Sequence, residues 1–167
     1  MPQGPAARLL DPVAHPLPPV LTGGPGSPNV LIGAKPAWRG LPLAAVAALQ
    51  AAKTVADTAI NTAVAATAAA AGTPAAPAAY AAEQAAKTAA LTAMSSAIGP
   101  AAAGGTDIHN CATPSPVPPH GPGVVINGSA TVQINNMPAC RMGDTLLEAI
   151  GPPSSVTSGD ATVLIGG

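Results

Sequence analysis

The chain has almost no aromatic side chains: its 167 residues include one Trp, one Tyr and no Phe. A core built only from Ala, Val, Ile and Leu buries little area per residue, and small cores of this kind usually need a metal ion, a disulfide or a partner. Charge is also scarce, since 8% of residues are charged and the net charge is −1. Without a basic patch and interleaved aromatic residues, the chain has no electrostatic basis for binding nucleic acid.

The amino-terminal segment Met1-Pro2-Gln3-Gly4 lacks the charged-then-apolar pattern of a secretory signal. We therefore expect the chain to be made in the cytoplasm and to leave the cell, if it does, by another route. Proline and glycine, in contrast, are abundant, with 21 and 18 residues. Such a composition is typical of disorder or of a turn-rich β fold, and internal repetition favours the folded alternative.

A segment that reads as turn, strand and turn occurs three times, at residues 26–33, 128–135 and 159–166. In each copy a Val and an Ile stand two positions apart, which places both side chains on one face of a strand. The flanking Gly, Asn and Asp residues favour tight turns. We predict one short strand in each copy.

A second motif, Pro-Ala-x-Arg, also occurs three times, at residues 5–8, 36–39 and 138–141. An Asp follows each Arg, at three positions' distance in the first and third copies and after a long interruption in the second. We expect these residues to cap turn N–H groups, and they are Asp11, Asp144 and Asp107.

Together the two motifs define three units, about 5–35, 36–137 and 138–167. Short β units that cannot each bury a face are expected to pack around a common axis. The sequence therefore predicts a mainly β fold, a small tapering body of short strands with internal pseudo-three-fold symmetry. Its β domain comprises residues 1–40 and 106–167.

The middle unit carries an insertion at residues 41–105, which consists mostly of Ala with scattered Thr and favours helix strongly. Breaks near 72–77 and at Gly99-Pro100 predict two helices, about 43–70 and 78–98, that form a hairpin. Residues 58–82 carry no formal charge and are long enough to cross a membrane. A soluble hairpin is favoured because Asn and Pro residues interrupt this stretch and Ala is only weakly apolar.

The residues best suited to bind a metal ion lie outside the insertion. They are His15, His109, His120, Cys111 and Cys140. Imidazole nitrogen and thiolate sulfur are preferred ligands of four-coordinate zinc, and three His with one Cys complete a tetrahedron. Cys140 is the preferred thiolate because it occupies a repeat position. Cys111, two residues after His109, is the alternative ligand, and a disulfide between the two cysteines is a further one.

Catalysis has little support in the sequence. A hydrolase needs a nucleophile with a base and an orienting group, whereas the acidic residues mostly stand at turn positions. Glu148 is the only candidate base in the β domain. We therefore expect a closed, structural metal site and no enzymatic activity.

The repeated motifs identify a resemblance. Pro5-Ala6-Ala7-Arg8 reads as the tetrapeptide that names the PAAR family, and the motifs at 36–39 and 138–141 are similar to its repeats. The resemblance covers about 1–40 and 106–167. It implies a cone of short strands that caps the trimeric, VgrG-like spike of a type VI secretion system, phage tail or related contractile injection particle.

The resemblance also implies a structural zinc near the tip, with iron less suited, bound here by His15, His109, His120 and Cys140. Each monomer would sit on a homotrimeric spike, carry effector cargo and touch the target membrane briefly during puncture. The insertion departs from the simplest members of the family. An alternative function is that of a membrane-active or zinc-dependent effector delivered on the spike.

Overall fold

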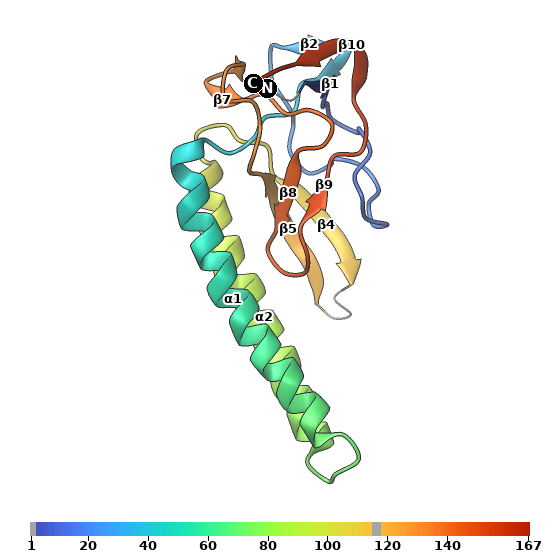
Figure 1. Cartoon of the computed structure of the whole chain (residues 1–167), viewed down its shortest axis with the longest axis vertical. Helices are drawn as coiled ribbons and strands as arrows, with labels where there is room; N and C mark the ends of the chain where they lie inside the picture. The colour runs from blue at the N-terminus through green and yellow to red at the C-terminus, as the bar shows by residue number, and fades with distance from the viewer. Residues whose placement is uncertain (1–2, 115–117) are drawn as a thin grey trace.

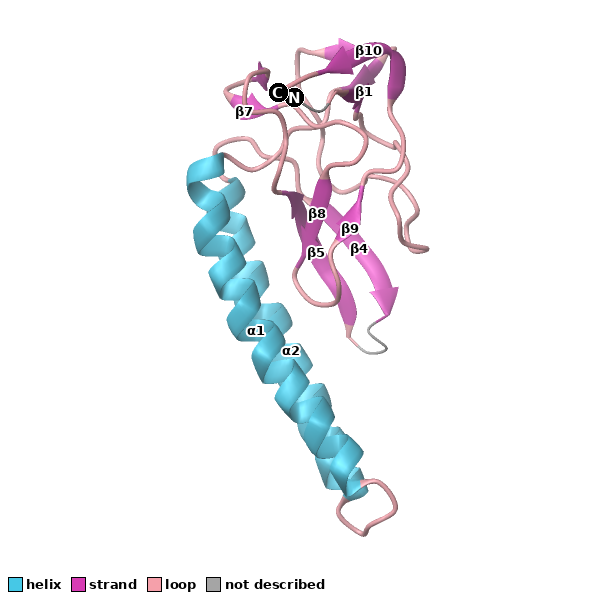
Figure 2. Ribbon diagram, viewed as in Figure 1, coloured by secondary structure: helices cyan, strands magenta, loops and turns pink. Residues whose placement is uncertain are grey.

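The computed structural model describes residues 3–114 and 118–167, and it combines two long helices with short antiparallel strands (Figures 1 and 2). Helix α1 spans Leu43–Ala70 and helix α2 spans Ala76–Ala102, with 28 and 27 residues. The predicted mainly β cone is therefore wrong, because the molecule is mixed α/β. The packed helices take up about a third of the chain, and the strands are too short to dominate it.

The strands form four antiparallel sheets among the described residues. A curled four-stranded sheet has the order β4-β5-β8-β9, and the other sheets are the pairs β1-β10, β2-β3 and β6-β7. The strands are β1 (Gly4–Ala6), β2 (Leu31–Ile32), β3 (Lys35–Pro36), β4 (His109–Pro114), β5 (Pro119–Val125), β6 (Gln133–Ile134), β7 (Met137–Pro138), β8 (Thr145–Glu148), β9 (Ser154–Ser155) and β10 (Asp160–Ile165).

The three Pro-Ala-x-Arg motifs meet in a ring of backbone hydrogen bonds. The N–H of Ala7 donates to the carbonyl of Cys140 at 2.9 Å, that of Cys140 to the carbonyl of Trp38 at 3.1 Å, and that of Trp38 to the carbonyl of Ala7 at 2.9 Å. Each motif thus donates one bond and accepts one. The ring joins two segments near the amino terminus to one near the carboxyl terminus.

The three two-stranded sheets share one small core. Each sheet contributes one Ile from a repeated strand, and each motif contributes its first Ala. The buried set is Ala6, Ile32, Ala37, Ile134, Ala139 and Ile165. The Val two residues before each Ile packs against the same cluster. The predicted Val and Ile face of each repeat is therefore the face that points inward.

The Asp residues that follow the motif Arg cap backbone N–H groups, as expected. A carboxylate oxygen of Asp11 accepts a hydrogen bond from the Arg8 N–H at 2.8 Å, and the third copy repeats this contact at 2.9 Å. In the second copy Asp107 accepts from the Arg39 N–H at 2.9 Å across the whole insertion. The insertion therefore leaves the Arg-to-Asp contact intact.

The hairpin packs one end of its length against the four-stranded sheet and extends beyond it (Figure 1). Met94 and Ile98 of α2 are buried in a cluster with Val124, Leu147 and Ile150. Within residues 58–82 no side chain is buried. Helix α1 is long and apolar enough to cross a membrane by length and composition. Its most apolar 18 residues have a mean hydropathy of 1.3, and 22% of them are buried within the fold.

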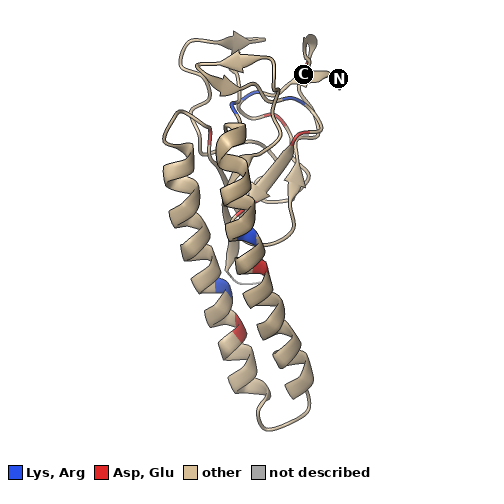
Figure 3. Cartoon of the chain, turned by 60° about the vertical axis from the view of Figure 1, so that its left-hand side comes forward, with Lys and Arg blue, Asp and Glu red and all other residues tan. Residues whose placement is uncertain are grey.

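The four charged residues of the hairpin form two ion pairs on neighbouring turns (Figure 3). Lys53 pairs with Asp57, and Lys87 pairs with Glu83 at 2.7 Å. The Nζ of Lys53 also donates to the carbonyl of Gly151 at 2.9 Å. Lys53 therefore fixes the hairpin to the loop that follows β8.

Truncation of the buried Ile98 tests whether the hairpin is docked on the sheet. Ile98→Ala removes a fully buried side chain, so we expect the free energy of unfolding to fall by about 2–5 kcal/mol. The control Val64→Ala truncates a side chain that is 41% exposed, and it should change stability by no more than about 0.5 kcal/mol. Denaturant unfolding measures both, and equal small losses would contradict the docked arrangement.

Candidate metal centre

The four-stranded sheet aligns the side chains of the centre through its register. His109 on β4 and Glu148 on β8 lie on either side of Gly123 on β5, each paired directly with it. A Cβ at Gly123 would lie 3.1 Å from the Cγ of Glu148. Because Gly123 has no side chain, the imidazole and the carboxylate can approach each other across the middle strand.

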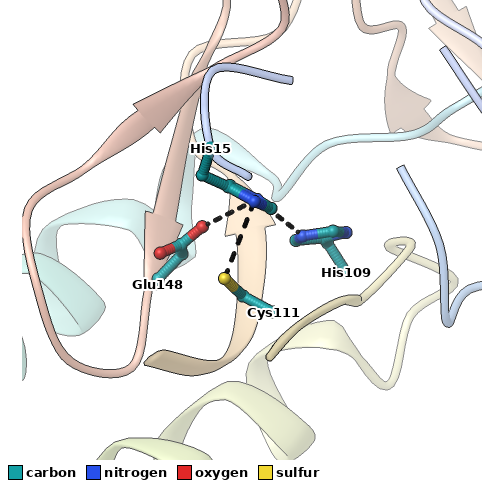
Figure 4. Close-up of side chains that lie close together, drawn as sticks. All are labelled: His15, His109, Cys111 and Glu148. Carbon is teal, nitrogen blue, oxygen red and sulfur yellow. Dashed lines mark hydrogen bonds and ion pairs between the residues drawn. The ribbon is translucent and has the colours of Figure 1, made fainter. Parts of the chain in front are cut away.

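Cys111 lies two residues after His109 on β4, so both side chains project from the same face of the strand. His15 enters from the loop after β1 and lies between the other three side chains (Figure 4). Its Nε2 is 2.9 Å from the Nε2 of His109 and 3.2 Å from the Oε1 of Glu148. Its Nδ1 is 3.8 Å from the Sγ of Cys111.

Both imidazoles of the cluster are held in the neutral form. Burial lowers the pKa of His109 to about 4, with a smaller contribution from His15. Burial also lowers the pKa of His15, against the opposing effect of the Glu148 carboxylate. Neutral imidazole is the form that binds metal ions, so both rings are ready to act as ligands at neutral pH.

The hydrogen bonds of His109 and the burial of Cys111 determine where the protons of these two side chains lie. The Nδ1 of His109 accepts a hydrogen bond from the Thr22 N–H at 3.2 Å, so its own proton lies on Nε2 and is directed at His15. Burial raises the pKa of the Cys111 thiol, which keeps it protonated. A metal ion bound to the Cys111 sulfur would displace the thiol proton, so its affinity should fall as the pH falls.

The donor set fits a metal ion. The side chains of His15, His109, Cys111 and Glu148 are buried, and their ligand atoms all lie within 4.8 Å of one another. The buried Oε1 of Glu148 has no hydrogen-bond partner, which is costly for a carboxylate oxygen unless a cation lies nearby. Two imidazoles, one thiolate and one carboxylate suit a four-coordinate ion.

Two of the four expected ligands, His15 and His109, lie in this group, and the other two do not. His120 contacts the outer oxygen of Glu148, with Nδ1 2.5 Å from Oε2, and lies outside the cluster. Cys140 lies in a separate apolar core with Trp38 and Val125, where burial raises its pKa well above the usual value. The side chain of Cys140 therefore packs in this core, and the cysteine that lies beside His15 and His109 is Cys111.

Cys111 was the alternative thiolate, and the two cysteines are both free, so they form no disulfide. The signal for Cys111 is its spacing, because His-x-Cys on a strand places both side chains on one face. Glu148 was considered only as a base. The sequence feature that could have indicated Glu148 as a metal-binding candidate is its position as the single charged residue in the apolar run Leu146–Ile150. A carboxylate buried in such a run requires a partner.

A scan against protein-family models, a search of curated proteins and a search of solved structures each found no match to this chain. The chemistry of the centre is therefore inferred from its own donor atoms and their surroundings.

Replacement of each cysteine in turn distinguishes the two candidate thiolates. We expect Cys111→Ala to weaken zinc binding by more than the roughly 10–100-fold that follows loss of a supporting contact, because it removes a ligand atom. The matched variant Cys140→Ala also removes a buried thiol, yet it should keep one equivalent of zinc at unchanged affinity. Metal analysis and competitive titration measure both. Loss of zinc from Cys140→Ala alone would restore the ligand set inferred from the repeats.

Proposed function

We propose that the chain caps a trimeric, VgrG-like spike in a contractile injection particle. The observation that carries this proposal is the ring of hydrogen bonds that joins Ala7, Trp38 and Cys140, one from each Pro-Ala-x-Arg motif. A monomer whose three motifs surround one axis can present three similar surfaces to the three chains of a trimer. The resemblance of these motifs to PAAR repeats supports the same function.

Exposed apolar side chains at equivalent repeat positions support a docking surface. Leu31 and Leu164 stand between the inward Val and Ile of their strands, and they are 64% and 60% exposed. Gln133 holds the same position in the remaining copy and is also exposed. Large exposed apolar residues are typical of partner-binding surfaces, and short strands with free edges favour pairing with another β protein.

The arrangement of the molecule leaves this surface accessible. Strands β1, β2, β7 and β10 gather at the end of the molecule that carries both termini (Figure 1). The loop that joins the two helices lies at the opposite end. The hairpin therefore leaves the strand-rich end free for the spike and is itself free to bind effector cargo.

In this proposal the metal centre has a mechanical role. An ion held by His15, His109, Cys111 and Glu148 would connect the loop after β1 to strands β4 and β8. Zinc suits this donor set, and a cross-link of this kind would hold the body together when the spike is driven through a membrane. A core with so few aromatic residues benefits most from such a connection.

The spike-cap function predicts the stoichiometry of a complex. We expect the zinc-loaded chain to bind a purified trimeric, VgrG-like spike with one chain per trimer, because a single monomer supplies all three docking surfaces. Light scattering after size-exclusion chromatography measures this ratio. Three chains per trimer, or no complex at micromolar concentrations, would argue against the function.

The docking surface is tested by charge substitution. The double variant Leu31→Lys and Leu164→Lys should weaken spike binding by at least about 10-fold, which corresponds to 1.4 kcal/mol. The control Val55→Lys alters a side chain on α1 that is 72% exposed and should leave the affinity unchanged. An equal loss in both variants would show that the strand-rich end is not the docking surface.

Metal removal tests the structural role of the centre. An ion that binds only the folded chain stabilises it by about 4 kcal/mol when free zinc is 1,000-fold above the dissociation constant. We therefore expect chelation to lower the unfolding temperature, with recovery on addition of zinc. Calorimetry with and without a chelator measures this, and equal unfolding temperatures would exclude a structural ion.

A further inference from the structure

One side of the metal centre faces a cavity of about 340 Å³, called the inner cavity below. Its lining includes His15 and Glu148 from the cluster, together with His120, Ala14 and residues 152–155. The other two members of the cluster, His109 and Cys111, do not line it. The centre is therefore open beside its carboxylate ligand and enclosed beside its thiol.

The carboxylate on the open side is held by a residue outside the cluster. The Nδ1 of His120 lies 2.5 Å from the Oε2 of Glu148, so Oε1 is left to face His15. The His120 ring packs closely against Gly151, where a Cβ would lie 2.6 Å from Nε2. Gly151 also has a φ of 83°, a left-handed conformation that favours glycine.

His120 also faces a second, larger cavity of about 550 Å³, the outer cavity, which lies between the hairpin and the loop after β8. This cavity is lined by Asp57 and Lys87 from the helices and by Pro152 and Pro153 from the loop. Because His120, Pro152 and Pro153 line both cavities, the open side of the centre lies next to the outer cavity as well.

We propose that the centre exchanges its ion with the solvent through the inner cavity, with Glu148 as the ligand that dissociates and His120 as the positioning residue that holds it. If Oε1 of Glu148 left a bound ion, water from the cavity would take its place, and no electron would be transferred. His15, His109 and Cys111 would hold the ion until a competing ligand removed it. This inference rests on the metal centre and is independent of spike docking.

The first test uses the unaltered protein loaded with Co²⁺, whose absorption band from thiolate coordination reports the bound ion. In an exchangeable centre, the rate of band loss in EDTA rises with EDTA concentration, because the chelator reaches the ion in the folded protein. A closed centre loses its ion only on unfolding, so its rate is independent of EDTA and equals the unfolding rate. That second result would overturn the proposal.

The second test separates positioning from coordination. His120→Ala should keep one Co²⁺ and an unchanged thiolate band, while its dissociation constant and release rate rise roughly 10–100-fold. His120→Asn, which retains a donor near Glu148, should recover part of this loss. Gly151→Ala should weaken binding in the same direction because the new Cβ displaces the imidazole ring.

Two results would contradict the role of His120. Loss of the bound ion or a shifted thiolate band in His120→Asn would make His120 a ligand, and an unchanged affinity and release rate in both His120 variants would remove its positioning role. If His120→Ala fails to fold, His120→Asn and the EDTA dependence of the unaltered protein still decide the question. Val55→Ala truncates a side chain on α1 that is 72% exposed and lines neither cavity, so it serves as the control and should leave every value unchanged. The ratio of one chain per spike trimer is unaffected by any of these outcomes.

Discussion

Three backbone hydrogen bonds hold the β part of the molecule together, and they join Ala7, Trp38 and Cys140 in a ring. Because only main-chain atoms take part, the side chain at this position can differ between the copies. The three side chains are all at most 1% exposed, and they fill one core with very different volumes. The constraint on the sequence therefore lies in the flanking Pro, Ala and Arg, which recur, and not in the residue between them.

A single contact at the base of the insertion explains how a long insertion fits into a small fold. Arg39 and Asp107 are 68 positions apart, yet the Asp carboxylate accepts from the Arg N–H and Nε at 2.9 and 3.0 Å, as in the contiguous first copy. The free-energy cost of closing a loop grows only slowly with its length, so a buried ion pair at the base can close a long one. The hairpin then gains further stability from its own contacts with the sheet and with Gly151.

The buried charge of Glu148 explains why the candidate centre favours a cation. Glu148 is fully buried between His15 and His120, in a part of the chain with few other charges. Burial favours neutral His15 and His109, which leaves the carboxylate short of positive charge. A bound cation would supply that charge and would give the orphaned Oε1 a partner. The glycine at position 123 is what lets the two sides of the cluster meet across β5.

Local sequence was sufficient for features that depend on neighbouring residues. It predicted the range 43–70 for a helix, the inward Val and Ile faces, and the Asp caps of the turns. Helix α2 begins earlier and ends later than 78–98 predicts, because Pro77 is tolerated in a first turn and the last turn buries Ile98 and Ala102 against the sheet.

The tertiary structure alone decided the fold class and brought together half of the candidate metal-binding cluster. Periodicity reports which side of a strand a residue faces, but not how much of the fold each element occupies or which strands become neighbours. Cys140 and Cys111 are both buried, and only the pairing of β4, β5 and β8 places Cys111 and Glu148 beside the two histidines. That pairing joins residues far apart in the chain, so no local pattern contains it.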